Sequence, residues 1–328
     1  MTSIIVEFEN ATLKGMEELR GFLQSLQREI SRVSASASAG NIEILCVHPS
    51  REVVASSPAI QATLENIERD FGGLADVEVI EARGARYYEL KNAAARRARG
   101  EIIVFVDSDI LVTEAWLKTL LAPFADPEVV VSCGLTSFLA EDFISRTFAL
   151  TWFFPLPNDD PQRLNNRALH ANNIAFRRAW FVENPYPLND GFKVSCTLHT
   201  REITRQGVKV VRTGAVGYHR FWEDGVAFLL WRAAVMGRDA DRKFLARKGH
   251  DRFPRSIHAL SNWGRRMVSV PVRLVKNHRK VGMPAYEVPF AILVSWAFDS
   301  IASISQFITA IGLQKPCVEY LPSRFQVH

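Results

Sequence analysis

The feature that most limits the possible folds is an apolar run at residues 102–106, which leads into two aspartates. Gly100 precedes the run, and its five residues are apolar without alternation. Such a run predicts a strand that is covered on both faces, as in a parallel sheet. Asp107 and Asp109 lie on the same side of an extended chain, because strand side chains repeat every second residue. The sequence therefore predicts a buried strand that delivers two carboxylates to its carboxyl end.

Strands and helices alternate along the first part of the chain. We expect strands at 4–8, 42–47, 77–80, 102–106 and 129–133, and helices around 19–26 and at 60–71, 88–98 and 114–124. This order predicts an α/β fold with a mixed, mainly parallel sheet flanked by helices. Ligands of such sheets bind beyond the carboxyl ends of the strands, where Asp107 and Asp109 fall.

The pattern after this alternation is less regular. We expect an extended segment at 170–177, a helix at 197–205, a strand at 208–211 and a helix at 225–248. We therefore divide the chain into a catalytic domain at 1–224 and a basic helical region at 225–328.

Two carboxylates at a strand end suit a hard divalent cation. Oxygen ligands of this kind bind Mg²⁺ or Mn²⁺, and through the cation a diphosphate. The alternative for an isolated Asp-x-Asp is a solvated turn, or an N-cap for the helix expected after Thr113. The surrounding residues, described below, favour the cation.

The C-terminal region is basic and then apolar. Residues 231–280 contain 14 Lys or Arg against three Asp, a net charge of +11 in a chain of net charge +5. The apolar block at 288–313 is long enough to cross a bilayer, which needs about 20 residues. It carries a polar stripe that includes Ser295 and Asp299, and a carboxylate at mid-span costs roughly 2.5–3.5 kcal/mol. We predict a helix that is embedded in or lies on an anionic membrane surface; a soluble core helix is the alternative.

The placement of the protein follows from its termini and cysteines. The N-terminus begins with a strand and lacks a signal-peptide layout, and the four cysteines are scattered without a Cys-x-x-Cys pair. We predict the cytoplasmic face of the cell membrane. The basic run is accompanied by no recognisable nucleic-acid module, so we expect no nucleic-acid partner.

The residues before the two aspartates carry a family resemblance. Residues 90–101 read LKNAAARRARGE and lead directly into the strand that ends at Asp109. This segment resembles the family 2 glycosyltransferases, inverting enzymes of the GT-A fold. In that family an Asn and small residues open a helix, Ala-x-Gly closes it, and the next strand ends in Asp-x-Asp. The resemblance covers residues 3–235, and relatives often add membrane-associating C-terminal helices.

The resemblance implies roles for individual residues. Asp107 would lie near the ribose and sugar of a nucleotide-sugar donor, and Asp109 would ligate Mg²⁺ or Mn²⁺ bridging the diphosphate. His219 is assigned as a further metal or phosphate contact, with a packed structural histidine as the alternative. The remaining residues assigned to the substrate are Glu9, Lys91, Asn92, Asn172 and Asn173. For the two residues at 172–173, a simple turn is the alternative.

The chain also departs from the family pattern. The acidic pair that usually holds the catalytic base falls at Ser195-Cys196, where neither residue is a carboxylate. Because direct inversion requires a base for the acceptor hydroxyl, we assign this role to Asp190, which lies nearby in the sequence. Glu223 and Asp224 are interpreted as caps of the helix after Gly225.

These observations lead to one main functional hypothesis. The protein is expected to transfer a sugar, with a metal ion, from a nucleotide-diphosphate sugar to a hydroxyl of a lipid-linked or polysaccharide acceptor. A catalytically degenerate binding or scaffold protein of a polysaccharide assembly complex is the first alternative. A nucleotidyltransferase is the second, although no Gly-rich phosphate loop supports it.

Overall fold

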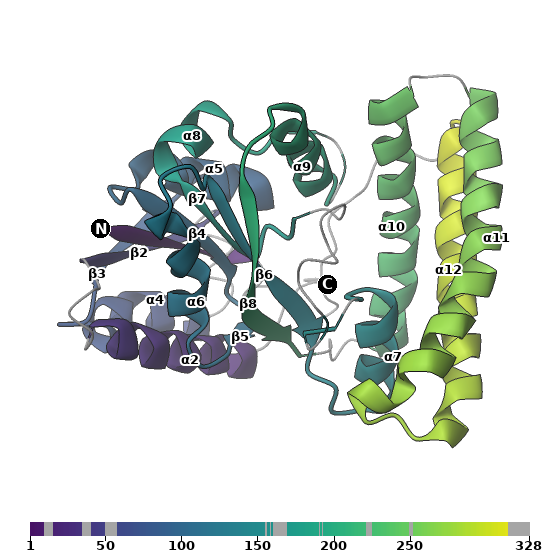
Figure 1. Ribbon diagram of the computed structural model, residues 1–328, viewed down its shortest axis with the longest axis horizontal. Coiled ribbons are helices and arrows are strands. Elements are labelled where there is room, and N and C mark those ends of the chain that lie inside the picture. Colours follow the sequence, from purple (N-terminus) through teal and green to yellow (C-terminus); the bar gives the residue numbers. More distant parts are fainter. Residues whose placement is uncertain are drawn as a thin grey trace. The chain divides into compact units, whose positions relative to one another are not determined.

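The computed structural model describes residues 1–9, 16–34, 41–49, 58–154, 156–157, 159, 169–189, 191, 193–220, 225–248 and 252–313. The chain forms two compact units, and Figure 1 shows their elements. The first unit consists of Met1–Ser137, Pro157–Leu188 and His199–Arg220, and the second of Phe138–Leu156, Asn189–Leu198 and Phe221–His328. The domain boundary was expected after residue 224. The last segment of the second unit begins at residue 221.

The first unit is built around one eight-stranded sheet. Its strand order is β3-β2-β1-β4-β7-β6-β8-β5. The strands are β1 (Thr2–Glu7), β2 (Ile42–His48), β3 (Asp76–Glu81), β4 (Ile102–Asp107), β5 (Ile110–Val112), β6 (Val131–Phe138), β7 (Asn173–Arg177) and β8 (Val210–His219). Strands β3, β2, β1 and β4 are parallel, whereas β7 pairs antiparallel with β4 and β6, and β5 pairs antiparallel with β8. The predicted α/β class with a mixed sheet is confirmed.

Helices cover the sheet on both faces (Figure 1). They are α2 (Met16–Ser34), α4 (Pro58–Asp70), α5 (Tyr87–Arg97), α6 (Trp116–Leu121), the 3-10 helix η1 (Ala122–Ala125), α8 (Arg178–Glu183) and α9 (Ser195–Arg205), of which α9 begins in a segment of the second unit. Even-numbered residues of β1, β2 and β4 join one core cluster with α2, α4 and α6. Odd-numbered β4 residues face the other side, where Phe105 contacts Phe176 and Phe181. Burial on both faces explains why residues 102–106 are apolar without alternation.

The start of β4 is fixed by a buried carboxylate. Glu43 in β2 accepts hydrogen bonds from the Ser3 hydroxyl, from the Arg99 backbone N–H and from the Arg99 side chain. Burial opposes the charge of Glu43, but these hydrogen bonds outweigh it and lower its pKa. A Cβ at Gly100 would lie 2.5 Å from the Ser3 hydroxyl oxygen and 2.6 Å from the Ser3 nitrogen. Only glycine therefore allows the chain to pass this close to β1 before it enters β4.

The second unit is helical. It contains α7 (Phe143–Thr151), α10 (Gly225–Lys248), α11 (Arg252–Asn277), the 3-10 helices η3 (His278–Val281) and η4 (Ala285–Glu287), and α12 (Val288–Ala310). Phe148, Phe298 and Trp152 pack together in its core, with ring centroids 4.7–5.2 Å apart. Within the described residues, the segment 285–310 is the one helix that is long and apolar enough to cross a membrane, a property that core helices of soluble proteins also have.

Candidate functional site

Asp107, at the carboxyl end of β4, is held by two side chains of α5. The Tyr87 hydroxyl donates to the carboxylate at 2.9 Å from Oδ1 and from Oδ2, and the Lys91 ammonium lies 2.7 Å from Oδ1. Tyr87 and Lys91 are four residues apart, so they share one face of the helix. The Lys91 side chain is fully buried and that of Asp107 is 3% exposed. Lys91 therefore neutralises a carboxylate that would be costly to bury alone.

A second buried carboxylate, Glu7, lies at the end of the neighbouring strand. It pairs in register with Asp107 and is fully buried. Its Oε2 accepts a hydrogen bond of 2.9 Å from the backbone N–H of Glu9, whose own side chain is half-buried. Burial raises the pKa of Tyr87 well above its usual value, and the charges of Asp107 and Glu7 raise it further. Tyr87 therefore stays protonated and keeps its hydrogen to donate to Asp107.

Sequence reasoning selected Glu9 at this strand end and missed Glu7 and Tyr87. The sequence contained one indication of where Glu7 points. Glu7 lies two residues after Ile5 and therefore shares its face of β1. Its proximity to Asp107, however, follows from the pairing of β1 with β4, which the sequence alone does not fix.

Asp109 forms one end of a chain of four polar side chains. Its Oδ2 lies 3.2 Å from Nδ1 of His219, and Nε2 of His219 lies 3.0 Å from Nδ2 of Asn172. Oδ1 of Asn172 in turn accepts a hydrogen bond of 3.1 Å from the Thr136 hydroxyl. In this arrangement the Asn172 amide donates to Nε2, so the neutral imidazole carries its hydrogen on Nδ1 and directs it at Asp109. The fold thus joins three predicted site residues, Asp109, His219 and Asn172, which are far apart in the sequence.

The burial of the two aspartates excludes one of the alternatives considered for the Asp-x-Asp pair. Asp107 and Asp109 are 2% and 3% exposed, so they do not form a solvated turn. The first turn of α6 is instead capped by Glu29 of α2, whose carboxylate accepts from the backbone N–H groups of Ala115 and Leu117 at 3.1 and 3.3 Å. Neither aspartate is needed as an N-cap.

The donor set at Asp109 and His219 fits a divalent cation. No group of three or more Asp, Glu, His or Cys side chains that could hold a metal occurs among the described residues. Two protein donors are nevertheless enough for Mg²⁺ or Mn²⁺ in sites where water and substrate phosphates complete the coordination. For His219 to ligate an ion through Nδ1, the imidazole hydrogen would have to move to Nε2, and the Asn172 amide would have to turn its oxygen toward it, because a ligating imidazole nitrogen must be unprotonated.

Two other predicted residues are used within the scaffold of the first unit. The Asn92 side chain makes two hydrogen bonds with the backbone of Tyr186, of 2.9 and 3.0 Å. Asn173 is fully buried, accepts from the Trp116 indole at 2.9 Å, and donates to the carbonyl oxygens of Leu135 and Ala215. These contacts hold the loop and the strands around the site.

The region expected to supply the catalytic base lies partly outside the described residues, because Asp190 is not among them. Residues 189, 191 and 193–198 of the second unit are described. Ser195 accepts a hydrogen bond of 2.6 Å from the Asn189 amide, and the Cys196 thiol lies 3.4 Å from the Lys193 carbonyl oxygen. Asp239 accepts from the backbone N–H of Lys193 at 2.9 Å, which ties this loop to α10.

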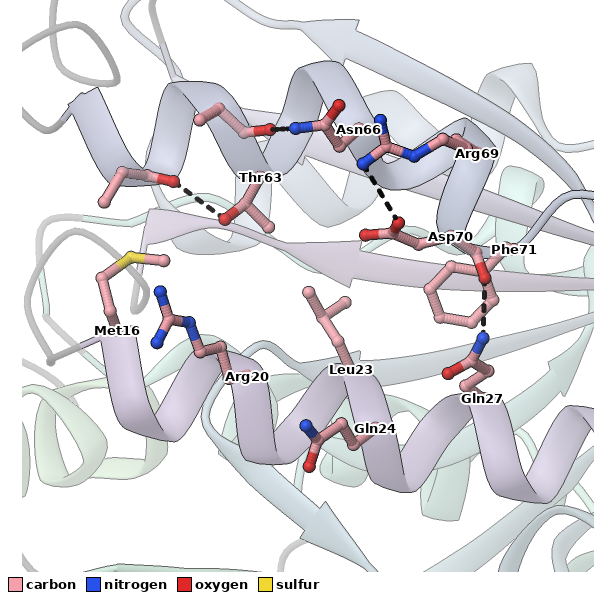
Figure 2. A pocket seen from close by; sticks show the side chains of 12 residues that line it. Met16, Arg20, Leu23, Gln24, Gln27, Thr63, Asn66, Arg69, Asp70 and Phe71 are labelled. Atoms are coloured by element: carbon pink, nitrogen blue, oxygen red, sulfur yellow. Dashed lines mark hydrogen bonds and ion pairs between the residues drawn. The ribbon is translucent and has the colours of Figure 1, made fainter.

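A pocket of about 460 Å³ lies between α2 and α4, and contains none of the predicted site residues. Figure 2 shows Arg20 and Leu23 of α2 facing Thr63 and Asn66 of α4 across it. Thr63 and Asn66 donate to carbonyl oxygens of their own helix. We assign no role to this pocket.

Comparisons with known proteins agree with the fold. Residues 53–183 match the model of the family "Glycosyl transferase family 2". A stretch of 108 residues is 31% identical to the "Probable N-acetylgalactosaminyltransferase 8" of Caenorhabditis elegans, and covers 27% of this chain and 26% of that protein. This chain thus spans about a quarter of the length of that relative.

A solved structure resembles nearly the whole chain. It is the mannosyltransferase PcManGT from Pyrobaculum calidifontis in complex with GDP-Man and Mn²⁺, at a TM-score of 0.54 and 14% identity, over 96% of this chain and 88% of that one. At this identity the likeness shows the fold, which is of the GT-A type with additional C-terminal helices.

Proposed function

We propose that this chain, which carries a family 2 glycosyltransferase domain on a GT-A fold, transfers a sugar from a nucleotide-diphosphate sugar to a hydroxyl group. The observation that carries the proposal is the pairing of Asp109 with His219 at 3.2 Å, beside the buried Asp107 at the end of the sheet. Two named relatives support a sugar-nucleotide donor: one is called an N-acetylgalactosaminyltransferase, and the other was solved with GDP-Man and Mn²⁺.

The donor would be held by residues of the first unit. Asp109 and His219 would hold Mg²⁺ or Mn²⁺, which, when bound, offsets the negative charge that develops on the diphosphate leaving group. Asp107 is already neutralised by Lys91, and its carboxylate is oriented by Tyr87. It is therefore suited to accept hydrogen bonds from donor hydroxyl groups rather than to ligate the cation. Glu9, whose side chain is half-buried, remains a candidate for a further donor contact.

The acceptor is a glycan or a lipid-linked sugar, and Asp190 removes the proton from its attacking hydroxyl. The proposal for Asp190 rests on its sequence position, because Ser195 and Cys196 stand where relatives carry acids. The acceptor would be reached at the cytoplasmic face of the membrane, to which the basic and apolar second unit would bind.

The donor proposal is tested with Asp109→Ala. Nucleotide-sugar binding is measured by calorimetry with and without Mn²⁺, for a panel of GDP- and UDP-sugars. We expect Mn²⁺-dependent binding to the natural sequence and none above the metal-free level for the variant. Asp126→Ala is the matched control, because Asp126 is an exposed carboxylate of the same unit, paired with Lys209. Metal-independent binding that Asp109→Ala leaves unchanged would refute the proposal.

The alternative is a catalytically degenerate binding or scaffold protein. It is motivated by Ser195 and Cys196, whose side chains are engaged within their own loop. A donor hydrolysis assay separates the two functions. Turnover that disappears in Asp190→Asn while donor binding persists supports the enzyme, whereas donor binding without turnover in the natural sequence supports the scaffold.

A further inference from the structure

The polar stripe of α12 is buried within the second unit. Ser295, Asp299 and Gln306 are 1–3% exposed, and Arg266 of α11 donates to Asp299 at 2.7 Å. The polar groups that make a membrane position costly are therefore covered by protein. The opposite side of α12 is exposed and apolar, with Phe290, Leu293 and Ile304 58–60% exposed.

A second exposed apolar stripe, which the sequence analysis did not predict, runs along α11. It consists of Ile257, Leu260, Val268, Val272 and Val275, which are 47–68% exposed. They are spaced by three, eight, four and three residues, which places them on one side of the helix. The other side is buried and includes Ala259, Val270 and Leu274. Helix α11 is thus apolar on both sides, and only one of them faces the protein.

The two stripes meet at a pair of tryptophans. The Trp263 indole N–H of α11 donates to the Ser300 hydroxyl of α12 at 3.1 Å, and the Trp296 indole N–H of α12 donates to the Met267 carbonyl of α11 at 3.0 Å. Both tryptophans are partly exposed, at 41% and 37%. In Figure 1, α11 and α12 run side by side along their length. We call the exposed surface formed by these two stripes and the two tryptophans the interfacial face.

The packing of α10 on α12 argues against a transmembrane α12. A Cβ at Gly237 of α10 would lie 2.0 Å from the Ala302 carbonyl oxygen, so the two backbones touch near the middle of α12. Helix α10 contains Arg232, Arg238, Arg242, Lys243 and Arg247. A spanning α12 would draw these charges into the hydrocarbon, where each is costly. A helix that lies on the membrane avoids this cost.

The charge next to the interfacial face is uniformly positive. Residues 252–281 contain eight Lys or Arg and no Asp or Glu. Arg255 and Arg266 are paired with Asp241 and Asp299. Arg265, Lys276 and Arg279 are exposed. A face that combines exposed apolar residues, tryptophans and basic residues matches the boundary between anionic headgroups and acyl chains.

We propose that the interfacial face binds, parallel to the surface, to a bilayer containing anionic lipid, with α11 and α12 contributing together. The inference deepens the membrane part of the proposed function and does not depend on sugar transfer. Membrane contact, expected from the sequence for one apolar helix at 288–313, is thereby assigned to a surface formed by two helices.

The test uses the full chain and vesicles of phosphatidylcholine with or without phosphatidylglycerol. We expect flotation with the anionic vesicles, and weaker binding as salt rises because the charge attraction is screened. Val268→Glu should lower the partition coefficient by about tenfold or more, since it places a charge in the apolar stripe. Val226→Glu is the matched control: Val226 of α10 is 70% exposed, Val268 is 68% exposed, and only Val268 belongs to the interfacial face.

The electrostatic part is tested with Arg265→Gln combined with Lys276→Gln. We expect about tenfold weaker binding to anionic vesicles and little change on neutral ones. The control is Arg69→Gln combined with Arg83→Gln, two exposed arginines of the first unit. Equal effects of the two pairs would overturn the role assigned to the interfacial face.

Three results would overturn the inference. The first is no binding of the natural sequence to anionic vesicles. The second is resistance of the bound protein to alkaline carbonate extraction, which indicates a spanning helix. The third is a lipid-free dimer, measured by light scattering, that Val268→Glu dissociates, which assigns the face to a second copy of the chain. Donor binding is also measured without vesicles. If it is unchanged in Val268→Glu, a failure of membrane binding is distinguished from a failure of the proposed sugar transfer.

Discussion

The buried pair of Lys91 and Asp107 allows a quantitative test of how the site is built. Asp126 and Lys209 form a pair of the same length, 2.7 Å, in the same unit. The two pairs differ in burial: the side chains of Lys91 and Asp107 are 0% and 3% exposed, whereas those of Lys209 and Asp126 are 47% and 43% exposed. Lys209 has a second exposed partner, Glu128, at 3.1 Å, so the comparison contrasts a buried with an exposed ion-pair site.

Removing one member of the buried pair leaves the other as an uncompensated charge. We expect Lys91→Met, or Asp107→Asn, to lower the free energy of unfolding by about 3–5 kcal/mol. Met keeps most of the apolar packing of Lys91, whose ammonium lies 4.6 Å from the Tyr87 ring centroid. The double variant Lys91→Met/Asp107→Asn removes both charges of the pair and should recover most of the loss, because neither partner is left charged without the other. Lys209→Met should leave the unfolding midpoint nearly unchanged.

Urea unfolding of the full chain, followed by circular dichroism and tryptophan fluorescence, measures these differences. The reasoning fails if Lys91→Met costs no more than Lys209→Met, or if the double variant is as unstable as the sum of its single variants. Donor binding provides a second readout: the double variant should be folded yet bind the nucleotide sugar poorly, because Asp107 has lost its charge.

Three further predictions concern individual contacts. Asn172→Ala should weaken Mn²⁺ binding in the presence of a nucleoside diphosphate by about 10–100-fold, because it removes the amide that orients His219; unchanged affinity in calorimetry would contradict this. Burial lowers the pKa of His199 to about 4, with its Nε2 2.7 Å from the Asn184 carbonyl oxygen. The unfolded chain therefore binds a proton at pH values where the folded chain does not, and stability should fall by about 3 kcal/mol from pH 6.5 to 4. Urea midpoints across this range should fall less steeply for His199→Gln. Gly100→Ala should destabilise by about 1–3 kcal/mol in the same assay through overpacking, whereas the control Gly264→Ala, where a Cβ meets nothing within 4 Å, should not.

The parallel half of the sheet was predictable from local patterns. The strand expected at 77–80 is β3 (Asp76–Glu81), and the helices expected at 60–71 and 88–98 are α4 and α5 within two residues at each end. In this half each strand is followed in the sequence by the helix that covers it. The spacing of apolar residues in each segment therefore predicts its secondary structure correctly.

The antiparallel half was less predictable. The strand expected at 208–211 is the ten-residue β8 (Val210–His219), whose residues alternate between buried and partly exposed and include three glycines or alanines. Strand β5 has only three residues, and it exists because it pairs with β8. Both strands depend on pairing between segments that are far apart in the sequence. Local composition does not predict such pairing.

In the candidate site, too, residues in local patterns were predicted and their distant partners were not. Asp107 and Asp109 were readable because they end an apolar run. The partners of Asp107 were not, since the burial of Lys91 depends on which face of α5 meets β4. The apolar stripe of α11 was also missed, because its valines are interspersed with basic residues and the segment was interpreted by its charge alone. The charge of this segment was recognised, and its periodicity was not.

The pairing of Asp109 with His219 joins residues that are 110 positions apart. During synthesis, the Tyr87, Lys91 and Asp107 cluster can assemble as soon as β4 docks beside β1. His219, the second proposed ligand, is made only with β8, the last strand of the first unit. If Asp109 and His219 hold a cation as proposed, a chain that ends before β8 lacks one of the two ligands, so metal binding would require completion of the unit.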